Sequence, residues 1–151
     1  MNDLDDQISA LEQGQTTINA KQTEQIAYAL ASSIPANQVL AFHGELGVGK
    51  TTFIRALAKA WGIKENVTSP TYNLYKIKQS NDRCLIHLDA YRLEKSADFE
   101  NLMINDFLND PWCLAIEWPE KIEDSIPSDA WHFYLTIEEN TFHHLRLARL
   151  Q

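Results

Sequence analysis

The residues that most directly suggest chemistry form a glycine-rich segment, Gly44-Glu45-Leu46-Gly47-Val48-Gly49-Lys50-Thr51. This segment matches the phosphate-binding pattern G-x-x-x-x-G-K-[ST]. Its glycines would let backbone N–H groups curl around phosphate oxygens without a Cβ in the way. Lys50 would reach the β- and γ-phosphates of a nucleoside triphosphate, and the hydroxyl of Thr51 would ligate Mg²⁺. No Asn-Lys-x-Asp motif for guanine is present, so ATP is the expected nucleotide.

Two acidic residues follow apolar runs and are candidates for binding magnesium or positioning the attacking water. Asp89 ends the run at 84–88, and Glu117 ends the run at 112–116. In open α/β sheets ligands bind at the carboxyl ends of the strands, so both acids are expected beside the glycine-rich segment. A P-loop ATPase needs one carboxylate near magnesium and another near the attacking water. The pattern alone does not assign these two tasks between Asp89 and Glu117.

Other residues near these motifs have two interpretations each. Thr68-Ser69-Pro70-Thr71 matches the position of a switch loop that senses the γ-phosphate, or it is a plain turn around its proline. Arg92 would neutralise phosphate charge or pair with a nearby acid. Trp118 would pack in the core or stack on a base. His43 and His87 lie in apolar strands, and we interpret them as buried histidines rather than ligands.

The elements that must position these residues alternate between strand and helix patterns. Apolar runs at 39–43, 84–88 and 112–116 are typical of strands in a parallel sheet covered on both faces. Alternating residues at 72–78 and 131–137 indicate further strands, and 142–150 would complete a C-terminal β-hairpin. The predicted fold is therefore α/β, a three-layer P-loop NTPase fold with a mostly parallel central sheet.

Three helices are predicted in addition to these strands. One is expected at about 20–33 with Asn19 as its N-cap, and another at 51–61 with Gly62 as its C-terminal cap. Ser96 is the expected cap of a third, running to about residue 108. Its inward residues would be Phe99, Leu102, Met103 and Phe107. Residues 1–13 would form a short amphipathic helix or a loose extension, so we divide the chain into an extension at 1–14 and a single domain at 15–151.

Composition limits the functional classes further. The net charge of −8 argues against direct nucleic-acid binding, because that affinity comes largely from lysine and arginine. No apolar run approaches the ~20 residues that span a bilayer, and the acidic N-terminus does not resemble a secretory signal. Cys84 and Cys113 lie in apolar runs and are expected to be buried free thiols. These features predict a cytoplasmic protein with no membrane association.

Four motifs, in this order and spacing, resemble the bacterial TsaE family of ATPases. They are the P-loop with its following threonine at 44–52, Ser-Pro-Thr-Tyr at 69–72, His-Leu-Asp-Ala-Tyr-Arg at 87–92 and Ile-Glu-Trp-Pro at 116–119. The resemblance covers about residues 15–150. It implies a P-loop ATPase that hydrolyses ATP to ADP and phosphate, weakly by itself, and acts in threonylcarbamoyl modification of adenosine 37 in tRNAs that read codons beginning with A.

The resemblance also implies roles for individual residues and partners. Thr51 and Glu117 would hold Mg²⁺, and Asp89 would be the Walker-B-like acid tied to hydrolysis. With Lys50, the two acids are the candidate catalytic residues, and Asp89 is a further candidate metal ligand. The partners would be the threonylcarbamoyl-transferase protein and its paralogous scaffold, with tRNA reached only through them. The nucleotide would be bound by Gly44, Glu45, Leu46, Gly47, Val48, Gly49, Lys50, Thr51, Thr52, Ser69, Thr71 and Arg92.

Two other functions fit the P-loop from the residues alone. A small-molecule kinase usually needs a lid with converging arginines, and no segment holds a suitable arginine pair. A nucleotide-dependent protein-binding switch would need no turnover. The pair of acids at the strand ends argues against such an inactive site.

Overall fold

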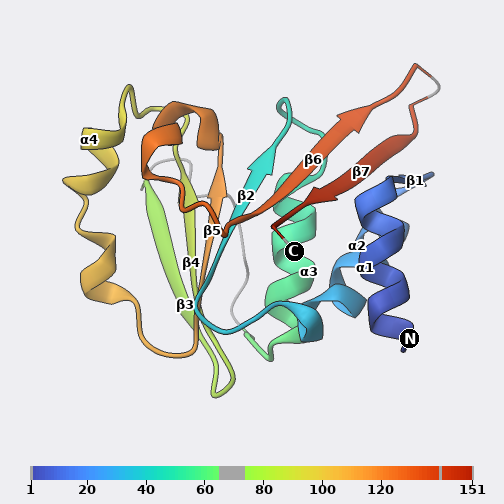
Figure 1. Cartoon of the computed structure of the whole chain (residues 1–151), viewed down its shortest axis with the longest axis horizontal. Helices are drawn as coiled ribbons and strands as arrows, with labels where there is room; N and C mark the ends of the chain where they lie inside the picture. The colour runs from blue at the N-terminus through green and yellow to red at the C-terminus, as the bar shows by residue number, and fades with distance from the viewer. Residues whose placement is uncertain (1, 65–73, 140, 151) are drawn as a thin grey trace.

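A seven-stranded sheet organises residues 2–64, 74–139 and 141–150, which are the residues that the computed structural model describes (Figure 1). Helices lie on both faces of this sheet, so the predicted three-layer α/β arrangement is confirmed. In spatial order the strands are β1 (Gln15–Thr17), β7 (His143–Ala148), β6 (Trp131–Ile137), β2 (Gln38–His43), β5 (Trp112–Glu117), β4 (Cys84–Asp89) and β3 (Tyr75–Gln79).

The four central strands run parallel, and the strands toward each edge run antiparallel to their neighbours. Strands β6, β2, β5 and β4 form the parallel part. Strand β3 pairs antiparallel with β4, and the hairpin of β6 and β7 is extended by β1. The predicted parallel centre and C-terminal hairpin are therefore confirmed. The short strand β1 has no counterpart among the elements expected from the sequence.

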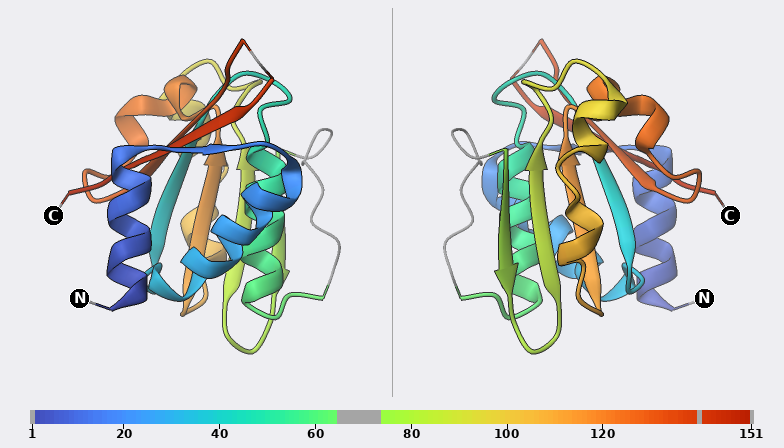
Figure 2. Two further views of the ribbon diagram at one scale, coloured as in Figure 1. Left: turned by 90° about the vertical axis from the view of Figure 1, so that its right-hand side faces the viewer. Right: turned by 90° about the vertical axis from the view of Figure 1, so that its left-hand side faces the viewer.

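Helices α1 (Asp3–Gln13), α2 (Ala20–Leu30) and α3 (Lys50–Ala60) lie on the same side of the sheet (Figure 2). Phe53 of α3 packs with Phe42 of β2 and Phe133 of β6 in an aromatic cluster. The rings of Phe42 and Phe133 stack with centroids 5.0 Å apart. The Asn19 side chain accepts a hydrogen bond from the backbone of Gln22, which confirms the predicted N-cap of α2. A short 3₁₀ turn, η1 (Ala31–Ser33), follows α2 directly.

The N-terminal residues form a helix that contributes to this core, so the helical alternative for residues 1–13 is confirmed. Ile8 and Leu11 of α1 are buried in the same cluster as the helices α2 and α3. Arg149 Nε also donates a 2.8 Å hydrogen bond to Glu12 Oε1, which ties α1 to the end of the chain. The boundary between an extension and a domain at residue 14 stays a prediction.

The opposite face of the sheet carries the short elements α4 (Ser96–Glu100), η2 (Ile104–Phe107) and η3 (Pro119–Ser125). The prediction of one helix over 96–108 is wrong, because the backbone turns left-handed at Met103, with φ 54°. This break turns Ile104 into the core at 2% exposure and leaves Met103 62% exposed. Phe107, predicted to point inward, is 42% exposed, whereas Phe99 and Leu102 do pack against the core.

The start of α4 also differs from its prediction. The helix begins at Ser96, and its N-cap is Lys95. Asp98 Oδ2 accepts hydrogen bonds from the backbone N–H groups of Glu94 and Lys95. An acid in the first turn therefore organises this helix start in place of the predicted serine cap.

The two cysteines are buried free thiols, as predicted. Burial raises the pKa of Cys113 to about 12, so its thiol stays protonated and packs as a small apolar group. Within the described ranges, none of the helices combines the length and the apolar character needed to cross a bilayer.

Candidate nucleotide and magnesium site

The glycine-rich segment connects β2 to α3, as a phosphate-binding loop requires. Gly44 follows the last residue of β2, and Gly49 is the N-cap of α3. A Cβ on Gly44 would lie 2.5 Å from the backbone oxygen of Leu135 and 2.7 Å from Val48 Cγ2, so no other residue fits there without movement. The N-terminus of α3 leaves its first N–H groups unpaired within the helix and adds partial positive charge. The loop is therefore built to bind an anion.

Lys50 is held inside this loop although it carries a charge. It is 4% exposed, and its Nζ donates a 2.6 Å hydrogen bond to the backbone oxygen of Gly44. The same Nζ lies 3.9 Å from the ring centroid of Trp118, a cation–π contact. Burial lowers the pKa of Lys50, whereas nearby carboxylates, chiefly Glu117, oppose that shift. The ammonium group is thus already desolvated and close to where phosphate would bind.

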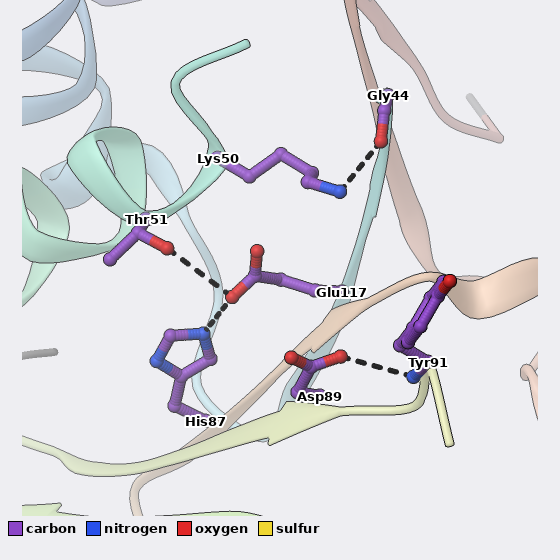
Figure 3. Close-up of polar contacts among 7 residues, drawn as sticks. All are labelled: Gly44, Lys50, Thr51, His87, Asp89, Tyr91 and Glu117. Atoms are coloured by element: carbon purple, nitrogen blue, oxygen red, sulfur yellow. Dashed lines mark hydrogen bonds and ion pairs between the residues drawn. The ribbon is translucent and has the colours of Figure 1, made fainter. Parts of the chain in front are cut away.

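Asp89 and Glu117 lie side by side at the carboxyl ends of adjacent parallel strands, as predicted (Figure 3). Alternation along the strands places both on the face that carries α3. Glu117 is 5% exposed, and its Oε2 accepts a 3.5 Å hydrogen bond from Thr51 Oγ1. Asp89 is half-buried, and its Oδ1 accepts a 3.0 Å hydrogen bond from the backbone of Tyr91. Only one of the two acids therefore contacts the threonine of the P-loop.

The environment of Glu117 fits a magnesium ion. Among the described residues, the polar contacts of this buried carboxylate come from His87 and Thr51, neither of which is a lysine or arginine. Lys50 supplies one positive charge near this buried anion. Mg²⁺ prefers oxygen ligands such as this carboxylate and the Thr51 hydroxyl, and it would add further positive charge here. No cluster of three or more His, Cys, Asp or Glu in the described ranges is arranged to hold a metal. Magnesium would therefore complete its ligand set with phosphate and water oxygens.

Two aromatic side chains, Trp118 and Tyr91, lie next to Lys50 or to each other. Trp118 is half-buried and has φ 59° and ψ 50°, a left-handed conformation that is rare for so bulky a residue. Its ring lies 5.1 Å from that of Tyr91, which is 58% exposed. The core interpretation of Trp118 is confirmed in part, because its half-buried side chain packs against the core while its ring also covers Lys50. Stacking on a base stays a prediction. Such backbone strain concentrates at functional sites.

The remaining predicted site residues differ in how exposed they are to solvent. Thr52 is half-buried in the first turn of α3, whereas Glu45 and Leu46 are exposed at the tip of the loop, Leu46 at 89%. Arg92 is exposed three residues after Asp89. The hydroxyl-rich segment with Ser69, Pro70 and Thr71 lies outside the described residues.

Two histidines have contacts that the sequence did not predict. His87 is buried, as predicted, but its Nε2 lies 2.5 Å from Glu117 Oε2. The period-2 alternation that brings residues 85, 87 and 89 to one face could have indicated this contact. His143 of β7 hydrogen-bonds through Nδ1 to the backbone oxygen of Val48 at 2.9 Å. No sequence signal links the C-terminal hairpin to the P-loop in this way.

His43, next to the P-loop, faces the opposite side of the sheet. Its ring stacks on Tyr134 with centroids 4.4 Å apart, and its Nε2 lies 2.8 Å from His132 Nδ1. The prediction of a buried histidine holds only in part, because His43 is half-buried. Burial, and then the neighbouring His132, lower the pKa of His43 to about 4, so the ring is neutral at physiological pH.

Comparison with known proteins identifies the family. The model of the family described as "Threonylcarbamoyl adenosine biosynthesis protein TsaE" matches residues 17–146. This chain belongs to the TsaE family. A relative from Bacillus subtilis, named tRNA threonylcarbamoyladenosine biosynthesis protein TsaE, is 35% identical over 115 residues, which are 75% of this chain and 70% of that protein. A relative of the same name from Rickettsia typhi is 32% identical and covers 82% of this chain and 87% of its own length.

A solved structure supports the same family and fold. The crystal structure of Bacillus subtilis YdiB superposes with a TM-score of 0.76 and 25% sequence identity, covering 91% of this chain and 85% of that one. The TsaE-family chain described here therefore has the predicted P-loop NTPase fold. The family-model match also spans all of the elements that form the P-loop and the two acid-ended strands.

Proposed function

We propose that this chain is a magnesium-dependent ATPase required for threonylcarbamoyl modification of adenosine 37 in tRNAs that read codons beginning with A. The proposal rests chiefly on the hydrogen bond between Thr51 and Glu117 beside the P-loop Lys50, in a chain of the TsaE family. The names of the relatives refer to tRNA threonylcarbamoyladenosine biosynthesis. The geometry supports a nucleotide site, and family membership supports its use in that biosynthesis.

The proposed division of work among the site residues follows from their contacts. Lys50 binds the β- and γ-phosphates, exchanging its bond to the Gly44 oxygen for phosphate oxygens. Thr51 and Glu117 hold Mg²⁺, which would neutralise charge on the phosphates. Asp89 lies beside Glu117 without contacting Thr51, which suits it to orient the attacking water. In addition to the P-loop at 44–52, Ser69, Thr71 and Arg92 are proposed to contact the nucleotide.

The proposed partners are the threonylcarbamoyl-transferase protein and its paralogous scaffold, in the cytoplasm. A net charge of −8 disfavours direct binding of tRNA, so tRNA is reached through these partners. The hydrolysis of ATP to ADP and phosphate would be weak in the isolated chain.

Replacing the acid assigned to hydrolysis tests the enzymatic part of this proposal. Asp89→Ala should keep ATP affinity in calorimetry within about threefold but reduce turnover by about 100-fold, the scale of a lost acid–base group. The matched variant Glu117→Ala should instead abolish the magnesium dependence of binding. Wild-type turnover in Asp89→Ala would move the hydrolytic role to another residue.

A capture experiment tests the biological part. The full-length chain is used as bait in lysate from its source organism, with a non-hydrolysable ATP analogue or without nucleotide. Nucleotide-dependent recovery of the threonylcarbamoyl-transferase protein and its paralogue is the expected result. Their absence under both conditions, together with phosphorylation of a small molecule by the purified chain, would favour a kinase instead.

A further inference from the structure

Beneath the candidate magnesium ligand lies a buried histidine that neither the motif roles nor the proposed hydrolysis uses. His87 is 1% exposed in β4, and its Nε2 hydrogen-bonds to Glu117 Oε2 (Figure 3). The same oxygen accepts the bond from Thr51 Oγ1. One oxygen of the carboxylate is therefore held from two elements, α3 and β4.

Packing of the strand does not explain a histidine at this position. Its neighbours in β4 are apolar, and Leu85 and Leu88 are fully buried. In the described part of the chain His87 Nδ1 is buried and has no hydrogen-bond partner. A leucine would fill the same layer without an unpaired ring nitrogen, whose burial reduces stability. The contact with Glu117 is what the imidazole offers and leucine does not.

The carboxylate determines which group donates in this contact. A carboxylate accepts hydrogen bonds, so the ring hydrogen is assigned to Nε2, which then donates to Glu117. Through this bond His87 orients the carboxylate from the side of β4. The other oxygen, Oε1, points away from His87 toward the side where Lys50 lies.

We propose that His87 is a positioning residue that fixes the Glu117 carboxylate for magnesium. The inference rests on the magnesium site of the proposed function and adds a residue that acts through Glu117. Histidines and carboxylates that orient a metal ligand from behind typically change metal affinity by about 10- to 100-fold when they are removed. Without His87, Oε2 would be left with the longer 3.5 Å bond from Thr51, so Glu117 would rotate among more conformers and hold the ion less tightly.

Calorimetry with ADP, which is not hydrolysed, separates positioning from general stability. Affinity is measured for the full chain with Mg²⁺ and with EDTA, and the ratio of the two values reports the coupling to metal. His87→Leu should lower that ratio about tenfold or more while changing the EDTA affinity by less than about threefold. His87→Gln, whose amide can still donate to Oε2, should keep most of the ratio.

The matched control is Ile86→Val in the same strand. Ile86 is fully buried on the opposite face, so this variant perturbs β4 without touching Glu117, and its metal ratio should equal that of the wild type. The positioning role would be overturned if His87→Leu kept the wild-type ratio of ADP affinities with Mg²⁺ and with EDTA. It would also be overturned if the variant lost ADP affinity equally under both conditions. Should His87→Leu fail to fold, a ratio in His87→Gln no better than that of Glu117→Ala would overturn it. A wild-type protein with no metal dependence would remove the magnesium part of the proposed function as well.

Discussion

The space around two glycines of the P-loop differs sharply, and this difference predicts unequal effects of the same substitution. Gly44 has φ 149° and Gly47 has φ 83°, so an alanine at either is strained by roughly 1–3 kcal/mol. At Gly44 the new Cβ would also lie 2.5 Å from the Leu135 oxygen in β6, whereas at Gly47 it would meet nothing within 4 Å. Overpacking adds roughly 1–3 kcal/mol. Gly44→Ala should therefore lose about 2–6 kcal/mol and Gly47→Ala about 1–3 kcal/mol.

Urea unfolding followed by tryptophan fluorescence measures both variants, since the chain has four tryptophans. Gly44→Ala should also weaken ATP binding, because relief of the clash must move either the loop or the end of β6. Gly47→Ala serves as the control for backbone strain alone. Equal losses of unfolding free energy in the two variants would refute the argument that close approach of β6 requires glycine at position 44.

Two other contacts lead to measurable effects. His143→Phe removes the donor to the Val48 oxygen, so it should lower unfolding free energy by about 1–3 kcal/mol and weaken ATP binding in calorimetry, unlike His144→Phe. An unchanged ATP affinity in His143→Phe would separate the hairpin from the P-loop. Because burial lowers the pKa of His43 from 6.5 to about 4, the unfolded chain takes up a proton first as pH falls, and stability declines from about pH 6.5 toward 4. His43→Phe should show a smaller fall in urea midpoint between about pH 7 and about pH 5 than the wild type, and an identical fall would contradict this.

The parts of the site that local pattern determines were predictable from the sequence. The P-loop needs a strand before it and a helix after it, and residues 39–61 supply both in unbroken sequence. Asp89 and Glu117 each end an apolar run, so both were expected at the carboxyl edge of the sheet, where the parallel register pairs them. These placements were predictable because each depends on the order of strand, loop and helix within one segment of the chain.

Contacts between distant segments account for what the sequence did not predict. The spacing of Phe99, Leu102, Met103 and Phe107 fits a helix, but the backbone turns left-handed at Met103 and buries Ile104 instead. Strand β1 is only three residues long, and it exists because β7 offers a partner. The bond from His143 to Val48 joins residues that are 95 positions apart. Periodicity within a segment carries no information about such a partner.

The two acids occupy equivalent positions in adjacent strands but have different surroundings, and this difference gives physical content to their proposed roles. Glu117 is 5% exposed, and one of its oxygens is already shared by Thr51 and His87. A carboxylate held this firmly suits an ion that demands near-ideal ligand geometry, as Mg²⁺ does. Asp89 is half-buried, and within the described ranges its carboxylate accepts a hydrogen bond from the backbone N–H of Tyr91. An acid with access to solvent can exchange hydrogen bonds with water, so under the proposed function the environment, rather than the residue type, would assign metal binding to Glu117 and water activation to Asp89.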